Sequence, residues 1–330
     1  MTKVFLTGAS GFIAKHIIRE LLEQGYDVRG SVRSEKRKAE VEALFPDAPL
    51  EFAFLDLNKD DGWAEAMEGC DVLMHTASPF PMADPKDPEE VIRPAVDGTL
   101  RAMNAALAAG IKRVVLTSSC VAIYKQVDKA IDAPSDETYW TSPDEPYVSP
   151  YEASKTLAEK AAWDFVAEHP EMTLTTINPG VVLGPALDGS YGTSLELVER
   201  IMKRTDPMLP PMHMPCVDVR DVAMMHVAAL STEAAKGERF SATAQTVTFR
   251  EIAEMLKTWD PELKVSTSVA PPWLLRIFAV FMPEARGVIP NIGRNLEVSG
   301  AKAEKTFGFA FIPVKEAVAA SAASVRRFSG

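Results

Sequence analysis

A glycine-containing turn follows a short apolar stretch near the N-terminus, and few folds accommodate that combination. Residues 3–6 predict a buried strand, the turn reads Thr7-Gly8-Ala9-Ser10-Gly11-Phe12-Ile13-Ala14, and a helical pattern continues to about residue 24. A strand, a glycine turn and a helix in this order predict a dinucleotide-binding βαβ unit. Gly8 permits the tight turn, and Gly11 lets the backbone approach a pyrophosphate. A purely structural turn is the alternative, because the spacing is Gly-x-x-Gly-x-x-Ala.

Short apolar stretches alternate with helical patterns along the first half of the chain. The later stretches cover residues 27–33, 50–55, 69–75, 111–116 and 173–177, and a long helical pattern covers 88–109. This alternation predicts an α/β fold of the Rossmann type, a doubly wound parallel sheet with helices on both faces.

The overall charge limits the partners of the chain. Its 330 residues carry a net charge of −11 and include three cysteines that lie far apart in sequence, Cys70, Cys120 and Cys216. The negative charge argues against binding to nucleic acid or to an anionic membrane surface. The cysteines give no disulfide framework and no metal-ligand spacing, so we expect no metal and a reducing, cytoplasmic location. The N-terminus lacks the pattern of a secretory signal.

One apolar run, residues 273–282, is too short to span a bilayer as a helix. It predicts a helix packed on the body of the protein. An apolar lid or pocket wall and association with a membrane are the alternatives.

The residues after the second predicted strand bear on the choice of dinucleotide. An NAD site usually places an acidic residue here to bind the ribose 2′-hydroxyl. The chain carries Arg33 instead, followed by Lys36, Arg37 and Lys38. Cations suit a 2′-phosphate, which arginine can bind through two hydrogen bonds. We therefore predict NADP(H) as the cofactor, although an ordinary solvated helix start would also explain Lys36 to Lys38.

Other candidate ligand-binding residues follow the ends of later strands. Asp56 would either accept from an adenine amino group or cap a turn, and residues 76–78 leave room for a ligand. His75 is interpreted as a structural core residue. Because the composition changes beyond Gly184, we predict an NADP-binding domain with the catalytic residues over 1–184. A smaller substrate-binding region would cover 185–330, with some segments returning to the first domain.

The stretch from Thr117 to Lys155 carries the candidate catalytic residues. It opens with Thr117-Ser118-Ser119 after an apolar run and closes with a helical pattern that holds Tyr151 and Lys155. Residues i and i+4 of a helix share one face, so these two side chains would project together. We expect the ammonium to lower the phenol pKa from its usual value of about 10. The pair would then exchange a proton near neutral pH.

These motifs together resemble the extended short-chain dehydrogenase/reductase family. The finer match is to its dihydroflavonol reductase and cinnamoyl-CoA reductase branch, which also holds NADPH-dependent aldehyde and ketone reductases. The resemblance rests on the glycine turn, Asp56-Leu57, Ser118-Ser119 and Tyr151-x-x-x-Lys155, with support from residues 178–185 and 217–223. It covers nearly the whole chain and weakens beyond about residue 255.

The resemblance implies a role for each matching position. Tyr151 would donate a proton to the carbonyl oxygen, Lys155 would lower its pKa and bind the nicotinamide ribose, and Ser119 would be the catalytic serine. Arg33 matches the ligand of the 2′-phosphate. The other positions implied in cofactor binding are Thr7, Gly8, Ser10, Gly11, Phe12, Ile13, Lys36, Asp56, Leu57, Thr76, Ala77, Ser78, Thr117, Pro179, Gly180, Val181, Val182 and Ser194.

Tyr124 separates the chain from one part of that branch. Plant dihydroflavonol reductases carry an asparagine at this position, where it contacts the flavonoid ring, so Tyr124 argues against a dihydroflavonol substrate. Residues 205–215 are rich in proline and methionine and are expected to build an apolar pocket over the nicotinamide. The candidate substrate contacts are Ser78, Tyr124, Met208, Met212 and His213. Core filling by the methionines is the alternative, and Asp218, Arg220 and Asp221 are interpreted as structural ion pairs and a helix cap.

The predicted function is an NADPH-dependent carbonyl reductase acting reversibly on an aldehyde or ketone, as a monomer or homodimer. Two alternatives remain. A nucleotide-sugar epimerase or dehydratase of the same family would retain NAD, which Arg33 disfavours, and a dehydratase would carry an acidic pair in place of Cys120-Val121. A non-catalytic NADPH-binding sensor would commonly lack the tyrosine or the lysine.

Overall fold

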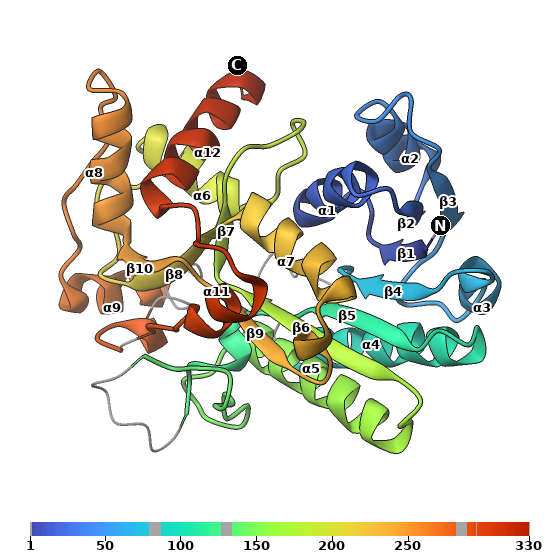
Figure 1. Ribbon diagram of the computed structural model, residues 1–330. Coiled ribbons are helices and arrows are strands. Elements are labelled where there is room, and N and C mark those ends of the chain that lie inside the picture. Colours follow the sequence, from blue (N-terminus) through green and yellow to red (C-terminus); the bar gives the residue numbers. More distant parts are fainter. Residues whose placement is uncertain (1, 79–86, 127–133, 282–288, 295, 330) are drawn as a thin grey trace.

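The computed structural model describes residues 2–78, 87–126, 134–281, 289–294 and 296–329, which are built around a seven-stranded sheet (Figure 1). The strand order is β3-β2-β1-β4-β5-β6-β9, and the neighbouring strands pair in parallel. The strands are β1 (Lys3–Thr7), β2 (Asp27–Val32), β3 (Glu51–Phe54), β4 (Val72–His75), β5 (Arg113–Thr117), β6 (Thr173–Pro179) and β9 (Arg239–Ala242). The predicted Rossmann-type α/β fold is confirmed. Its strand order reverses between β1 and β4, where ligands of such sheets bind.

Successive side chains of each strand supply a core on either face of this sheet. In β1, Leu6 packs into the cluster that includes α1 (Phe12–Glu23) and α7 (Val219–Ser231). Phe5 packs instead into the cluster that includes α4 (Glu89–Ala108) and α5 (Pro150–Glu168). The two-residue repeat of a strand explains this division, and Figure 1 shows the two helix pairs on opposite sides of the sheet. The shorter helices α2 (Glu35–Glu42) and α3 (Trp63–Met67) follow β2 and β3.

A smaller, mixed sheet of three strands lies beside the first. It has the order β10-β8-β7 and consists of β7 (Val181–Leu183), β8 (His213–Asp218) and β10 (Gln245–Thr248). Helices α6 (Thr193–Met202), α8 (Phe249–Trp259) and α12 (Val314–Phe328) pack against it. The remaining elements are α9 (Pro272–Phe281), α11 (Ala301–Phe307), η1 (Cys120–Ala122), η2 (Glu233–Ala235) and η3 (Ile289–Asn291). The domain boundary at residue 184 stays a prediction.

Gly180 joins the two sheets. It links β6 to β7, and its N–H donates to the carbonyl oxygen of Ala242 over 3.1 Å. A Cβ at this position would lie 2.3 Å from the carbonyl oxygen of Pro215. No side chain fits such an approach, so glycine is required where the chain passes from the seven-stranded sheet to the smaller one.

Two predictions about the second half need refinement. The loop expected over residues 205–215 already becomes strand β8 at His213, because residues 213–216 pair with β10. The apolar run 273–282 does form a helix, α9, but Trp273 and Ile277 are 61% and 50% exposed, so it is only partly packed. Met282 lies outside the described residues. Among the residues that the structure describes, no helix is both long and apolar enough to cross a bilayer.

Candidate active site

Helix α5 presents the candidate tyrosine and lysine from its first two turns. Ser149 caps its N-terminus and Pro150 occupies the first helical position, where a missing N–H is tolerated. The Ser149 hydroxyl accepts from the N–H of Glu152, whose carboxylate accepts from the N–H of Ser149 in return. This capping box sets the start of the helix. Tyr151 and Lys155 consequently lie one turn apart on the same face.

The two serines after β5 point in different directions. Ser118 is buried, and its hydroxyl donates to the carboxylate of Glu159 over 2.5 Å. Ser119 begins η1, accepts from the N–H of Val121, and hydrogen-bonds the phenol of Tyr151. The geometry therefore favours Ser119 over Ser118 as the hydroxyl available to a substrate.

A buried ion pair ties the loop after Ser119 to the start of α5. Lys125 and Glu152 lie 2.7 Å apart, with side chains 1% and 6% exposed. The hydroxyl of Tyr124 donates to the same carboxylate over 3.4 Å. The loop and the helix are thereby held together, which fixes Ser119 relative to Tyr151.

Burial dominates the protonation of the candidate pair. It raises the pKa of Tyr151 to about 12, and the hydrogen bond with Ser119 offsets only part of that shift. The expected lowering of this pKa by Lys155 is therefore wrong for this structure, since removing water from around a phenolate outweighs other effects. Burial also lowers the pKa of Lys155 to about 8, against the opposing effect of Glu159. At neutral pH the tyrosine is protonated and most of the lysine is cationic.

A cavity of about 320 Å³ lies over the glycine turn and reaches this pair, and it is called the dinucleotide cavity below. The predicted cofactor residues that line it are Gly8, Gly11, Phe12, Ile13, Thr76, Thr117, Tyr151, Lys155, Pro179, Gly180, Val182 and Ser194. Two helices begin at it, α1 after Gly11 and α6 after Gly192, and neither has a side-chain cap. Uncapped helix N-termini offer N–H groups and a positive dipole end to phosphates. The donor set of the cavity therefore fits a pyrophosphate.

Other predicted cofactor residues are not among those that line this cavity. The Thr7 hydroxyl accepts from the N–H groups of Thr76 and Ala77, which braces the end of β4. Arg33 and Lys36 are exposed just after β2. The remaining ones are Ser10, Asp56, Leu57, Ala77, Ser78 and Val181. Asp56 accepts from the N–H of Asn58, as the alternative of a turn cap predicted.

A second cavity of about 330 Å³ adjoins the first, and it is called the substrate cavity below. Both share Ser119, Tyr151, Pro179, Gly180, Thr193 and Ser194. Of the predicted substrate contacts, Tyr124, Met212 and His213 line it, whereas Ser78 and Met208 are not among its lining residues. Sequence reasoning missed Val121, Leu197, Thr193 and Leu296 as lining residues. For Leu296, which comes from the far C-terminal part, no sequence signal was available.

Residues 185–194 cross the dinucleotide cavity, and this segment is called the strap below. Its Tyr191, Gly192, Thr193 and Ser194 line that cavity. The Nζ of Lys15 on α1 donates to both carboxylate oxygens of Asp188, over 2.6 and 2.7 Å. These contacts between α1 and the strap were not foreseen, because a lysine in an amphipathic helix normally predicts a solvated side chain.

Two structural interpretations are confirmed. His75 is 2% exposed, its ring Nδ1 lies 2.9 Å from the Thr7 hydroxyl, and burial lowers its pKa to about 3. Asp218 caps α7 and pairs with Arg220 over 2.8 Å, and the carboxylate of Asp221 accepts from the N–H of Ile312.

Comparisons against known proteins identify the family of this chain. The family model described as the NAD dependent epimerase/dehydratase family matches residues 4–242. The chain belongs to this family. Among relatives, a cinnamoyl-CoA reductase of Medicago truncatula is 35% identical over 81% of this chain and 83% of its own length. An NADPH-dependent methylglyoxal reductase of Saccharomyces cerevisiae is 31% identical over 99% of both chains.

Solved structures extend this relationship over the whole length of the epimerase/dehydratase-family chain. The crystal structure of yeast methylglyoxal/isovaleraldehyde reductase complexed with NADPH has a TM-score of 0.81 and 29% identity, and the match covers 100% of this chain and 99% of that one. Vestitone reductase from alfalfa has a TM-score of 0.77 and 25% identity, with 99% of both chains covered. The predicted membership of the extended short-chain dehydrogenase/reductase family, in the branch of these reductases, is confirmed.

Proposed function

We propose that this protein is an NADPH-dependent carbonyl reductase. One observation supports the proposal above others: Ser119, Tyr151 and Lys155 come together where the dinucleotide cavity meets the substrate cavity. The names of two relatives, a methylglyoxal reductase and a cinnamoyl-CoA reductase, agree with reduction of a carbonyl group.

The chemistry assigned to the three residues follows from their protonation and contacts. The cofactor, when bound, would supply the hydride. Tyr151 keeps its proton at neutral pH because of its raised pKa, so it can donate that proton to a carbonyl oxygen. Ser119, hydrogen-bonded to the phenol, holds the same oxygen, and cationic Lys155 stabilises the phenolate that is left. Donors fixed in place before the substrate arrives stabilise charge that develops in the transition state.

The cofactor assignment has support from both ends of the dinucleotide cavity. Gly8 has a φ of +68°, and a Cβ there would lie 3.1 Å from Ala77, so the turn suits glycine alone. The free helix N-termini of α1 and α6 suit the phosphates. Arg33 and Lys36 would hold the 2′-phosphate of NADPH, and residues 1–184 would form the NADP-binding domain.

The substrate cavity favours a small, largely apolar aldehyde or ketone. Its wall includes Val121, Leu197 and Met212, with the hydroxyl of Tyr124 and the ring of His213 as polar groups. Tyr124 lines the cavity and its hydroxyl is already bonded to Glu152, so its ring occupies space that the ring system of a dihydroflavonol would need.

A panel of aryl, aliphatic and acyl-CoA carbonyl compounds assayed with NADPH tests the proposal. Tyr151→Phe is expected to abolish NADPH oxidation, about a 10²-fold loss or more, while NADPH still binds. Tyr139→Phe is the matched control, since this tyrosine is 39% exposed and lines neither cavity. Retained turnover in Tyr151→Phe would refute the assignment of the acid. Tightly co-purifying NAD would indicate an epimerase, and NADPH binding without turnover of any carbonyl would indicate a sensor.

A further inference from the structure

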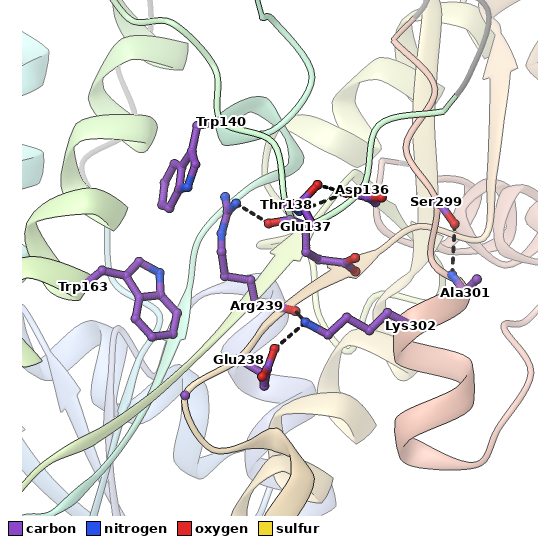
Figure 2. Close-up of a pocket in the computed structure, with 11 residues that line it drawn as sticks. Asp136, Glu137, Thr138, Trp140, Trp163, Glu238, Arg239, Ser299, Ala301 and Lys302 are labelled. Atoms are coloured by element: carbon purple, nitrogen blue, oxygen red, sulfur yellow. Dashed lines mark hydrogen bonds and ion pairs between the residues drawn. The ribbon is translucent and has the colours of Figure 1, made fainter. Parts of the chain in front are cut away.

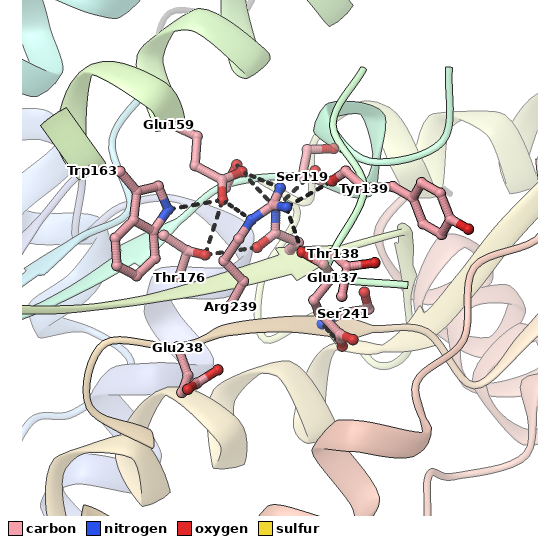
Figure 3. A network of polar contacts seen from close by, with 12 residues as sticks. Ser119, Glu137, Thr138, Tyr139, Glu159, Trp163, Thr176, Glu238, Arg239 and Ser241 are labelled. Atoms are coloured by element: carbon pink, nitrogen blue, oxygen red, sulfur yellow. Dashed lines mark hydrogen bonds and ion pairs between the residues drawn. The ribbon is translucent and has the colours of Figure 1, made fainter. Parts of the chain in front are cut away.

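Glu159 is a buried carboxylate one turn after Lys155 on α5, at the centre of a polar network (Figure 3). Its side chain is fully buried, and its two oxygens accept six hydrogen bonds, five from other parts of the chain and one from Trp163 on the same helix. The donors are Ser118 Oγ at 2.5 Å, Asn178 Nδ2 at 2.7 Å, Arg239 Nε at 2.7 Å and Nη2 at 3.4 Å, Thr176 Oγ1 at 3.1 Å and Trp163 Nε1 at 3.3 Å. A carboxylate buried this deeply is retained as an ion only when it is paired and hydrogen-bonded.

Arg239, on β9, supplies the opposite charge at the outer end of the network. Its Nη1 donates to the carbonyl oxygens of Glu137 and Tyr139, and its guanidinium stacks over Trp140 at 3.6 Å from the ring centroid. It thus has partners on every side.

Figure 2 shows the cavity of about 620 Å³ against which this arginine lies. The two cations that line the cavity are both paired, Arg239 with Glu159 and Lys302 with Glu238. Both of these cations therefore have a counter-charge from the protein itself. The part of the network that bears on the candidate active site is the opposite end, next to Ser119.

At that inner end, the carboxylate supports the backbone on which Ser119 is carried. Ser118 donates its hydroxyl to Glu159, and Asn178 donates its amide both to Glu159 and, over 3.2 Å, to the carbonyl oxygen of Ser119. Glu159 therefore restrains both peptide units that flank the α-carbon of Ser119.

The charge of Glu159 also acts on Lys155. The negative charge of Glu159 favours the protonated form of Lys155, and it thereby opposes burial, which lowers the pKa of that lysine. His75 on β4 faces Lys155 but is neutral, because burial holds its pKa at about 3. Tyr151, on the same helix, and Cys120, on η1, are protonated because burial raises their pKa values.

We propose that Glu159, held in place by Arg239, is a positioning residue of this site that fixes the backbone of Ser119 and places a negative charge one helical turn from Lys155. Its consequence for catalysis rests on the proposed function. Its effect on the charge of Lys155 concerns the protein alone and can be measured without turnover.

Trace acetylation measures that charge directly, because acetic anhydride reacts only with the neutral amine. The purified protein is labelled across a pH series, and the peptide that contains Lys155 is quantified by mass spectrometry. Lys155 is half-buried and lines the dinucleotide cavity, so a small reagent can reach it. The midpoint in the unmodified sequence is expected near pH 8. Glu159→Gln is expected to lower it by about one pH unit, which is roughly fivefold more free amine at pH 7.

A second variant guards against loss of folding. Glu159→Gln leaves Arg239 buried without a counter-charge, which is strongly destabilising. The double variant Glu159→Gln with Arg239→Met removes both charges and is expected to fold and to show a smaller shift in the same direction, because the nearby cation is lost as well. Trp163→Phe is the matched control, since it removes one neutral hydrogen bond to Glu159 and should leave the midpoint in place.

The outcomes separate this inference from the proposed function. An unmoved midpoint in the folded variants, or an equal shift in Trp163→Phe, overturns the inference. If the proposed function also holds, the alkaline limb of kcat for reduction moves to lower pH in step with the labelling midpoint. A shifted midpoint in a protein that reduces no carbonyl would support the role of Glu159 while refuting the proposed function.

Discussion

The ion pair between Lys15 and Asp188 is expected to control how firmly the strap closes on the dinucleotide cavity. The Lys15 side chain is 2% exposed, whereas that of Asp188 is 24% exposed. The two partners are therefore not equivalent. Asp188→Asn leaves a buried ammonium without a counter-charge, which costs about 3 kcal/mol or more. Lys15→Met fills the same space and leaves a carboxylate that water can reach, so the cost is about 1–2 kcal/mol.

Urea unfolding followed by tryptophan fluorescence measures these losses, because the chain contains five tryptophans. Titration with NADPH measures how the same variants change the affinity for the cofactor. Tyr191 to Ser194 line the cavity, so a loosened strap should weaken NADPH binding in both variants by about tenfold, equivalent to ~1.4 kcal/mol.

The control is Arg250→Met, which breaks the exposed pair between Arg250 and Glu254 on α8. It should change neither measurement, since exposed ion pairs contribute little. Equal stability losses in Asp188→Asn and Lys15→Met would refute the argument from burial. Unchanged NADPH affinity in destabilised variants would show that the strap does not restrain the cofactor.

Three further predictions concern cofactor choice, pH and the join between the sheets. Arg33→Asp should shift preference from NADPH toward NADH, and an unchanged ratio of kcat/KM for the two would mean that the 2′-phosphate is held elsewhere. Carbonyl reduction should fall as the pH rises through about 8, where Lys155 loses its proton and its charge, and a flat profile from pH 7 to 9 would contradict that role. Gly180→Ala should destabilise the protein by about 2 kcal/mol or more, because its Cβ would meet the Pro215 carbonyl oxygen at 2.3 Å, and an unchanged urea midpoint would contradict the strain.

The structural features that could be predicted from the sequence are those determined by residues close together in the chain. The strand–turn–helix at Gly8, the helix that carries Tyr151 and Lys155, and the alternation of strands and helices each depend on short-range periodicity and capping. The sheet therefore formed as predicted, with β9 added from a distant segment. The structural role of His75 and the helix cap at Asp218 could likewise be predicted from the residues next to them in the sequence.

What the sequence did not show depends on contacts between distant segments. In the sequence, Glu159 looks like any acidic residue of a helix. It pairs with Arg239 only in the folded protein, because the two residues are 80 positions apart. The strap and Leu296 reach the two cavities through tertiary packing, which leaves no local pattern. The predicted direction of the Tyr151 pKa shift was wrong for the same reason, because desolvation depends on everything that surrounds the phenol.

The parallel pairing of β6 with β9 bears on how the chain is made in the cell. The ribosome synthesises β6, and with it Glu159 on α5, well before β9 at Arg239–Ala242 emerges. Until then, one edge of the large sheet lacks its partner strand and the carboxylate lacks its counter-charge. An unpaired strand edge invites association with other chains. Completion of the sheet, closure of the Glu159 network and protection from aggregation should therefore occur in one late step, after the chain has grown past residue 242.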